Sequence, residues 1–158
     1  MRLISVGIVV IYMCVLAVGQ DRPAWVSNLD AVIAKQEPSW SVSEKKVNDV
    51  SGYFTELLKF KSGSLGIEIH IENFSSAKEA KEAFDGQKIA FTDILQLDAT
   101  KSTLEGLGDE NYMFTEKGKL RKASLFLLQN NVVVKVFASS ADIAMRFTKY
   151  VVDLIPHE

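Results

Sequence analysis

The fold class of this chain is decided by a short stretch, GIEIHIE at residues 66–72. Isoleucine alternates strictly with polar residues along it, which is the pattern of a β-strand with one buried and one solvated face. The β-branched isoleucines favour extended backbone as well. We therefore predict a strand whose residues 67, 69 and 71 face a hydrophobic core.

Residues on either side of this strand predict a hairpin followed by a helix. Gly52–Lys61 is a second apolar stretch of strand length, and Ser62-Gly63-Ser64 between the two stretches is typical of a hairpin turn. After the strand, Ser76-Ala77-Lys78-Glu79 has the spacing of a helix capping box. The helix that follows has a small apolar face made by alanines and Phe84, and Gly86 is its expected end.

The C-terminal part of the chain repeats this order. Leu120–Gln129 and Val132–Phe137 are the predicted arms of a second hairpin, and Asn130-Asn131 suits its turn because asparagine tolerates positive φ. Ser139 with Asp142 has the spacing of a second capping box, before a long amphipathic helix. The repeat indicates either a β-β-α duplication or two independent uses of a good helix start.

The remaining segments complete the predicted element order. Residues 24–35 carry apolar side chains at helical spacing. Ser43–Asp49 is polar and is expected to be a turn, and Asp98–Glu105 is expected to be a polar linker. Gln87–Leu97 has apolar residues without a clear period and is expected to be a short helix or irregular. Tyr112–Thr115 is a candidate for one more strand.

Together these elements predict a single α+β domain over residues 20–158, with an antiparallel sheet of about five strands and helices packed on one face. The full chain has 158 residues with 18 basic and 20 acidic side chains, so its formal net charge is −2. A chain of this length can bury a hydrophobic core. The small and mixed charge argues against a general nucleic-acid binder or a protein that binds anionic membranes.

Residues 1–19 have the pattern of a secretory signal peptide. A basic residue precedes an uncharged apolar stretch, LISVGIVVIYMCVLAV at 3–18, and the small residues Ala17 and Gly19 stand at the −3 and −1 positions of a cut before Gln20. An uncleaved anchor is the alternative, but the stretch is short for a membrane-spanning helix, which needs about 17–25 residues. We expect export to the periplasm or the extracellular space, with no stable membrane anchor after cleavage.

Cys14 is the only cysteine of the chain, and it lies inside the apolar stretch. Tyr12 and Met13 precede it where a lipoprotein signal needs small residues, so we expect no lipidation. A chain cleaved before Gln20 would contain no cysteine, hence no disulfide and no thiol chemistry. This absence fits bacterial export better than secretion from animal cells, where small proteins depend on disulfides.

One short motif precedes the second hairpin, Leu107-Gly108-Asp109-Glu110-Asn111-Tyr112. With the signal peptide and the two β-β-α units, it gives the chain a layout that resembles small exported bacterial domains of unknown function. The resemblance covers most of the chain after residue 19 and implies no catalytic residue. The absence of a lipoprotein signal departs from those members of the group that are lipoproteins.

Few side chains are available for chemistry. His70 lies between Glu68 and Glu72 on the polar face of the 66–72 strand, where alternate residues are about 6.6–6.8 Å apart. These three residues are the candidates for a metal site, but a solvated strand face is the favoured interpretation because further ligands are missing. The sequence contains no nucleotide-binding glycine motif and no G-x-S-x-G nucleophile motif, so we expect no cofactor.

The face of the sheet that carries His70 also carries apolar side chains from neighbouring strands. So much apolar surface is unusual on a sheet face left in water. The 24–35 helix, a second copy of the chain in a homodimer, or a ligand would each cover it. A one-residue error in strand register would exchange the faces of the last two strands. The residues expected to form this ligand or partner face are Tyr53, Leu57, Phe126, Val133, Lys135 and Phe137.

Two functions are consistent with these observations. The favoured one is an exported, non-catalytic binding or interaction domain, whose partner is an unidentified protein or a small apolar ligand and is not a nucleic acid. The alternative is a small metal-dependent or hydrolytic enzyme centred on His70. The sequence leaves the question of enzymatic activity open.

Overall fold

The structure of the chain, a computed structural model, describes residues 22–50, 53–91, 99–116 and 122–156. The predicted signal peptide, with Cys14, lies outside these residues. The described residues form three helices and seven strands. In chain order the elements are α1 (Ala24–Gln36), β1 (Ser41–Val50), β2 (Tyr53–Ser62), β3 (Leu65–Phe74), α2 (Ala77–Ile89), β4 (Ala99–Ser102), β5 (Glu110–Glu116), β6 (Ala123–Gln129), β7 (Val132–Ala138) and α3 (Ala141–Val152).

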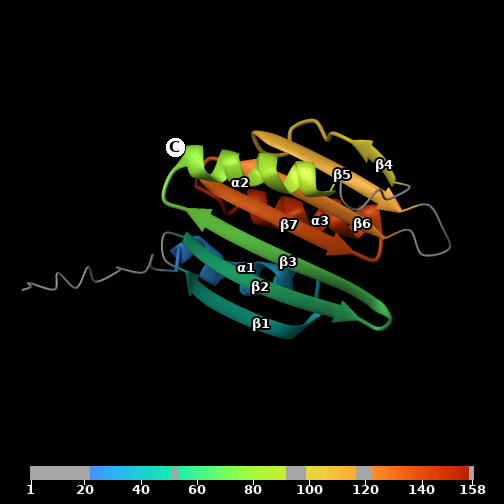
Figure 1. The fold of residues 1–158 in the computed structure, drawn as a ribbon. Helices are drawn as coiled ribbons and strands as arrows, with labels where there is room; N and C mark the ends of the chain where they lie inside the picture. The colour runs from blue at the N-terminus through green and yellow to red at the C-terminus, as the bar shows by residue number, and fades with distance from the viewer. Residues whose placement is uncertain (1–21, 51–52, 92–98, 117–121, 157–158) are drawn as a thin grey trace, which may run out of the picture.

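All seven strands belong to one antiparallel sheet with the order β1-β2-β3-β7-β6-β5-β4 (Figure 1). The predicted α+β class and antiparallel sheet are confirmed, and the sheet has seven strands where we expected about five. The GIEIHIE stretch lies in β3, which pairs with β2 and with β7 at the centre of the sheet. The two predicted hairpins are β2–β3 and β6–β7.

The two additional strands are β1 and β4, at the two edges of the sheet. We expected Ser43–Asp49 to be a turn, but it belongs to β1, and Asp98–Glu105, expected to be a linker, contains β4. An edge strand has a single pairing partner and is often charged, so it needs no hydrophobic alternation. The polar sequence of β1 therefore gave no sign of a strand. A bulge in its pairing with β2, between Val42 and Glu44, also interrupts any alternation along it.

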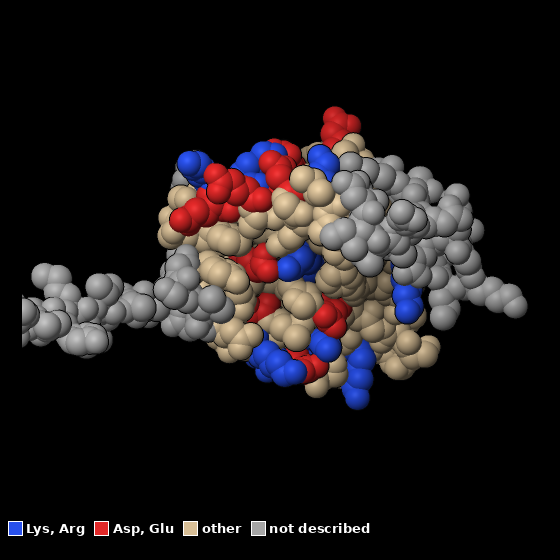
Figure 2. All heavy atoms as spheres, in the orientation of Figure 1, with Lys and Arg blue, Asp and Glu red and all other residues tan. Residues whose placement is uncertain are grey.

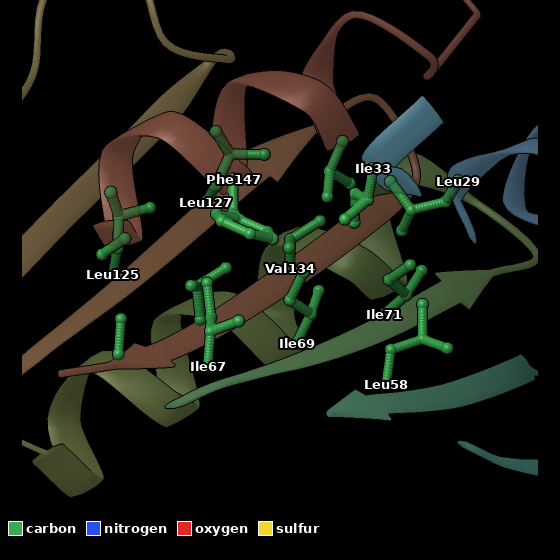
Figure 3. Packing of buried hydrophobic residues seen from close by; sticks show 14 of the residues in the cluster. Leu29, Ile33, Leu58, Ile67, Ile69, Ile71, Leu125, Leu127, Val134 and Phe147 are labelled. Atoms are coloured by element: carbon green, nitrogen blue, oxygen red, sulfur yellow. The ribbon is translucent and has the colours of Figure 1, made fainter. Parts of the chain in front are cut away.

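The helices cover both faces of the sheet, whereas we expected them on one face only. In Figure 1, α2 lies in front of the sheet, and α1 and α3 lie behind it. The larger hydrophobic core lies on the α1/α3 side and includes Leu29, Ile69 and Phe147 (Figure 3). Residues 132–134 of β7 and 125–129 of β6 are all buried. Consecutive strand side chains point to opposite faces, so these two strands need cover on both sides.

A smaller core lies under α2. Ala80 and Phe84 of this helix pack there with aromatic and aliphatic side chains of β5, β6 and β7. The ring of Phe126 lies 4.8 Å from that of Tyr112 and 4.4 Å from that of Phe91. α2 packs over β3, β6 and β7, and no described helix covers β1 and β2 on this face. Half of the face is therefore closed and half is open.

The two hairpin turns use the residues that the sequence indicated. Gly63 has a φ of 57° and Asn130 a φ of 52°. This left-handed conformation strains most side chains but suits glycine and asparagine. Both turns are therefore set by local sequence.

The starts of two helices are likewise set by serine caps. Ser76 accepts a hydrogen bond from a backbone amide in the first turn of α2, as its capping-box position predicted. In α3 this role belongs to Ser140, whereas we expected Ser139, whose hydroxyl instead bonds the backbone of β3. α2 also continues past Gly86, its expected end, to Ile89, and Gly86 does not have the positive φ of a helix-ending glycine.

The two β-β-α units are symmetric in their strands only. The sheet order is balanced about the central β3–β7 pair, with β2 and β6 as the next strands outward. A two-fold axis that exchanges two neighbouring antiparallel strands is perpendicular to the sheet, and it would keep both helices on the same face. α2 and α3 lie on opposite faces, so the similarity of the units ends with the hairpins.

Candidate functional site

One part of the sheet is left uncovered by the described helices: the α2-side face of β1 and β2, with the parts of β3 and β7 that α2 does not reach. We call it the open half-face. Its side chains form rows across the strands, and the strand register defines these rows. In one of them His70 pairs with Leu57 on one side and with Lys135 on the other. Figure 2 shows this side of the molecule, with basic and acidic side chains interspersed over the strands. The members are Glu44, Lys46, Tyr53, Leu57, Lys59, Glu68, His70, Glu72, Lys135 and Phe137.

Charged side chains on the open half-face form ion pairs across the strands. Lys59 Nζ lies 2.9 Å from Glu44 Oε2 and 3.2 Å from Glu68 Oε2. Lys46 contacts the other oxygen of Glu44. Hydrogen bonds from Lys46 and Lys59 lower the pKa of Glu44 to about 2. Hydrogen bonds to Glu44 and Glu68 raise the pKa of Lys59.

His70 is held between a carboxylate and an aromatic ring. Its Nε2 lies 2.5 Å from Glu68 Oε1, and its ring contacts the ring of Phe137 edge-on, with the centroids 5.6 Å apart. Burial opposes the ionisation of Glu68, but hydrogen bonds from His70 and Lys59 lower its pKa overall. The imidazole is therefore fixed in place by its neighbours on both sides.

The three candidate metal ligands do not converge on one point. Glu68 faces His70, whereas Glu72 accepts hydrogen bonds from Lys135 Nζ at 2.6 Å and from Gln87 Nε2 at 2.8 Å. Among the described residues, no group of three His, Cys, Asp or Glu side chains could hold a metal ion.

We therefore expect added divalent metals to leave the melting temperature unchanged. A metal that binds only the folded state would raise it, because binding to one state stabilises that state. The measurement is thermal unfolding with millimolar Zn²⁺, Mn²⁺ or Ca²⁺, with the His70→Ala variant as control. A rise in the melting temperature that His70→Ala abolishes would contradict this expectation and favour a metal site.

Two hollows mark the open half-face. A groove of about 530 Å³ extends from Lys59 in β2 across β3 and β7 to Lys122, just before β6. A second hollow of about 340 Å³ is lined by Tyr53, Leu57 and His70, among others. Both hollows are lined by apolar and charged residues together.

The structure divides the six residues expected to form a ligand or partner face. All six lie on the α2 side of the sheet in the observed register. Phe126 and Val133 have no exposed surface and lie in the core beneath α2. Their cover is α2, whereas the helix that we considered for this role, α1, packs on the other face. The four partly exposed residues are Tyr53, Leu57, Lys135 and Phe137.

The Leu107–Tyr112 motif has a structural role. Gly108 has a φ of 66°, and a Cβ on it would lie 2.8 Å from the carbonyl oxygen of Leu128, so a larger residue does not fit. Asp109 Oδ2 accepts a hydrogen bond from the amide of Asn130 in the β6–β7 turn. The motif thus fastens β5 to the second hairpin.

The next residues of the motif bind other parts of the chain. Glu110 accepts a hydrogen bond from Lys81 Nζ of α2 at 2.9 Å. Asn111 bonds backbone groups of the preceding loop at three points, through both its oxygen and its nitrogen. Asp109 and Glu110 therefore have different partners on different elements.

Comparison of the chain with protein-family models, with curated proteins and with solved structures gave no match. None of the helices in the described part of the chain is long and apolar enough to cross a membrane.

Proposed function

We propose that this chain is an exported, non-catalytic binding domain that takes its ligand on the open half-face. One observation carries the proposal: α2 closes half of a mixed apolar and charged sheet face and leaves the other half partly exposed and hollowed. Leu57, His70 and Phe137 are half-buried there. A concave surface with apolar walls and a few polar groups is the usual form of a small-ligand site.

Charged and polar side chains of the open half-face are held in fixed positions by hydrogen bonds. His70 Nε2 is engaged by Glu68, and both oxygens of Glu72 accept hydrogen bonds from Lys135 and Gln87. A few polar groups in fixed positions are what a small-ligand site uses to orient its ligand. These groups can therefore recognise a ligand through charge and shape.

A small ligand suits this surface better than a second copy of the chain. The core of a stable homodimer interface is depleted in charged residues. The open half-face instead has Lys59, Glu68 and Lys135 distributed among its apolar side chains. The lysines of β1 also discourage pairing of two copies through the free sheet edge. A homodimer is therefore the competing outcome of the test.

The test is NMR spectroscopy of the isotope-labelled exported protein with a mixed set of fragments: apolar acids, apolar amines and neutral aromatic alcohols. We expect the largest changes in backbone amide shifts around Leu57, His70 and Phe137. Leu57→Asp should weaken these changes because it places a carboxylate in the apolar wall. Val47→Asp is the matched control, since Val47 is an exposed apolar residue of the neighbouring strand that points to the other face.

Shift changes centred on the α1/α3 face, or scattered over the whole surface, would contradict the proposal. The same result would follow if Leu57→Asp and Val47→Asp behaved alike. Sedimentation of the protein without fragments addresses the competing outcome. A concentration-dependent dimer that Leu57→Asp dissociates would replace the small ligand by a second copy of the chain.

A further inference from the structure

The groove of the open half-face lies between two rows of side chains that cross the strands. The first row consists of the paired residues Lys59, Glu68 and Phe137. The second row starts with the pair Lys61 and Gly66, two residues further along β2 and two residues back along β3. Strand residues two positions apart share a face, so both rows point to the same side of the sheet.

The floor of the groove is open because Gly66 has no side chain. A Cβ added there would contact only the carbonyl oxygen of Phe60, at the ordinary distance of 4.0 Å. Gly66 does not have a positive φ, so the backbone does not require glycine at this position. Beside it, Ser139 Oγ accepts a hydrogen bond from Gly66 N at 2.9 Å and donates one to Gly66 O at 3.0 Å. The neighbouring hydroxyl is therefore satisfied, and the Phe137 ring borders the free space.

Two lysines at the rim of the groove carry charge that nothing in the described residues neutralises. Lys59 is paired with Glu44 and Glu68. Lys61 and Lys122 are exposed, line the groove, and have no ion-pair partner among the described residues. The chain as a whole has a formal net charge of −2, so this positive rim is a local feature. Such a local field favours an anionic ligand.

We infer that the groove binds a small amphiphilic anion, a molecule with an apolar body and one carboxylate, and this inference rests on the proposed function. The apolar body lies over Gly66 and against Phe137, and the carboxylate reaches Lys61 or Lys122. The groove volume of about 530 Å³ is within the range of about 300–1,000 Å³ that is typical of small-ligand sites. The lysines repel a cation, and a neutral sugar forms no ion pair with them.

Three probes with the same alkyl chain test the charge preference: decanoate, 1-decanol and decyltrimethylammonium. Their binding to the exported protein is measured by calorimetry, below the concentrations at which they form micelles. We expect decanoate to bind about 2- to 5-fold more tightly than decanol, the factor that one exposed ion pair supplies. Decyltrimethylammonium should not bind. Added salt should weaken decanoate binding, because it screens the exposed lysines.

Two variants test the place of binding. Gly66→Val fills the floor of the groove with a residue that suits a strand, and it should abolish decanoate binding while the melting temperature stays close to that of the original protein. The double variant Lys61→Gln/Lys122→Gln should make decanoate and decanol bind about equally. Lys149→Gln is the matched control, because Lys149 is an exposed lysine on α3, which packs on the other side of the sheet. It should change neither affinity.

The inference is overturned if decanoate binds Gly66→Val as tightly as the original protein, or if decanol or the cation binds as well as decanoate. It is also overturned if decanoate does not bind at all. In that case the fragment experiment separates the two proposals. If fragments still shift the amide signals around Leu57 and His70, the proposed function stands with another class of ligand. If neither decanoate nor any fragment binds, both the proposed function and this inference are refuted.

Discussion

Replacing Phe84 by alanine is expected to lower the free energy of unfolding by about 3–5 kcal/mol, the range for a large buried aromatic side chain. Phe84 is 1% exposed, and it is one of two buried residues in α2, the other being Ala80. Its ring lies 5.2 Å from the ring of Tyr112. The remainder of α2 is mostly polar, so this one side chain provides most of the apolar contact between the helix and the sheet.

The same substitution should also enlarge the open part of the sheet. When α2 is held less firmly, Phe126 and Val133 beneath it become accessible to solvent. We expect the Phe84→Ala variant to bind more of an apolar fluorescent dye than the original protein, at denaturant concentrations where its far-ultraviolet circular dichroism is still native. This effect would show that α2 sets the limit between the closed and open halves of the face.

Urea unfolding measures the change in stability. Glu82→Ala is the control on the same helix, because Glu82 is exposed, and its effect should stay within about 0.5 kcal/mol. A loss below about 1 kcal/mol in Phe84→Ala would mean that α2 is anchored elsewhere, since a buried phenylalanine normally contributes several times that amount.

Replacing Arg22 by alanine is expected to lower the stability by about 3 kcal/mol, because a buried carboxylate then loses its main partner. Glu56 lies on the core side of β2 with no exposed side-chain surface. Arg22, just before α1, donates to both of its oxygens at 2.7 Å, and this hydrogen bonding raises the pKa of the guanidinium. Lys45 Nζ, 3.4 Å from Glu56 Oε1, is the cation that stays behind.

A double substitution separates the charge from the packing. If the loss in Arg22→Ala comes from a buried charge that Lys45 alone does not compensate, adding Glu56→Gln should recover about 1 kcal/mol or more, because a neutral amide is less costly to bury. Arg146→Ala is the control for removing an arginine. It breaks a more exposed ion pair with Glu37 and should cost at most about 1 kcal/mol. The role of the buried charge would be refuted if Arg22→Ala and Arg146→Ala were equally stable. It would also be refuted if the double variant were less stable than Arg22→Ala.

The side of the sheet on which each candidate residue lies could be predicted from the sequence. Face membership depends only on alternation along a strand and on which residues are paired across strands. For that reason His70 and Phe137 are on one face, as expected. Alternation does not indicate whether a helix crosses above a given residue. Phe126 and Val133 therefore belong to the core, although nothing in their strand pattern distinguishes them from Phe137.

The groove could not be predicted in the same way. Its floor depends on the absence of a side chain at Gly66, and its rim depends on Lys61 and Lys122, which lie on segments far apart in the chain. The ion pairs of Lys59 with Glu44 were also missed, because β1 has no hydrophobic period and its polar sequence indicated a turn. These features arise from residues on separate segments of the chain, so no pattern within a short stretch of sequence predicts them.

By itself, the sequence determined the local structure of this protein: the period of β3, the glycine and asparagine turns, and the serine cap of α2. These features depend on interactions within a few residues, so a short stretch contains all the information. Residues 125–129 of β6 and 132–134 of β7 are buried on both sides of the sheet, which required cover on both faces but did not assign a helix to either. Only the tertiary structure placed α2 opposite α1 and α3 and left half of its face open, because that choice depends on packing between distant segments.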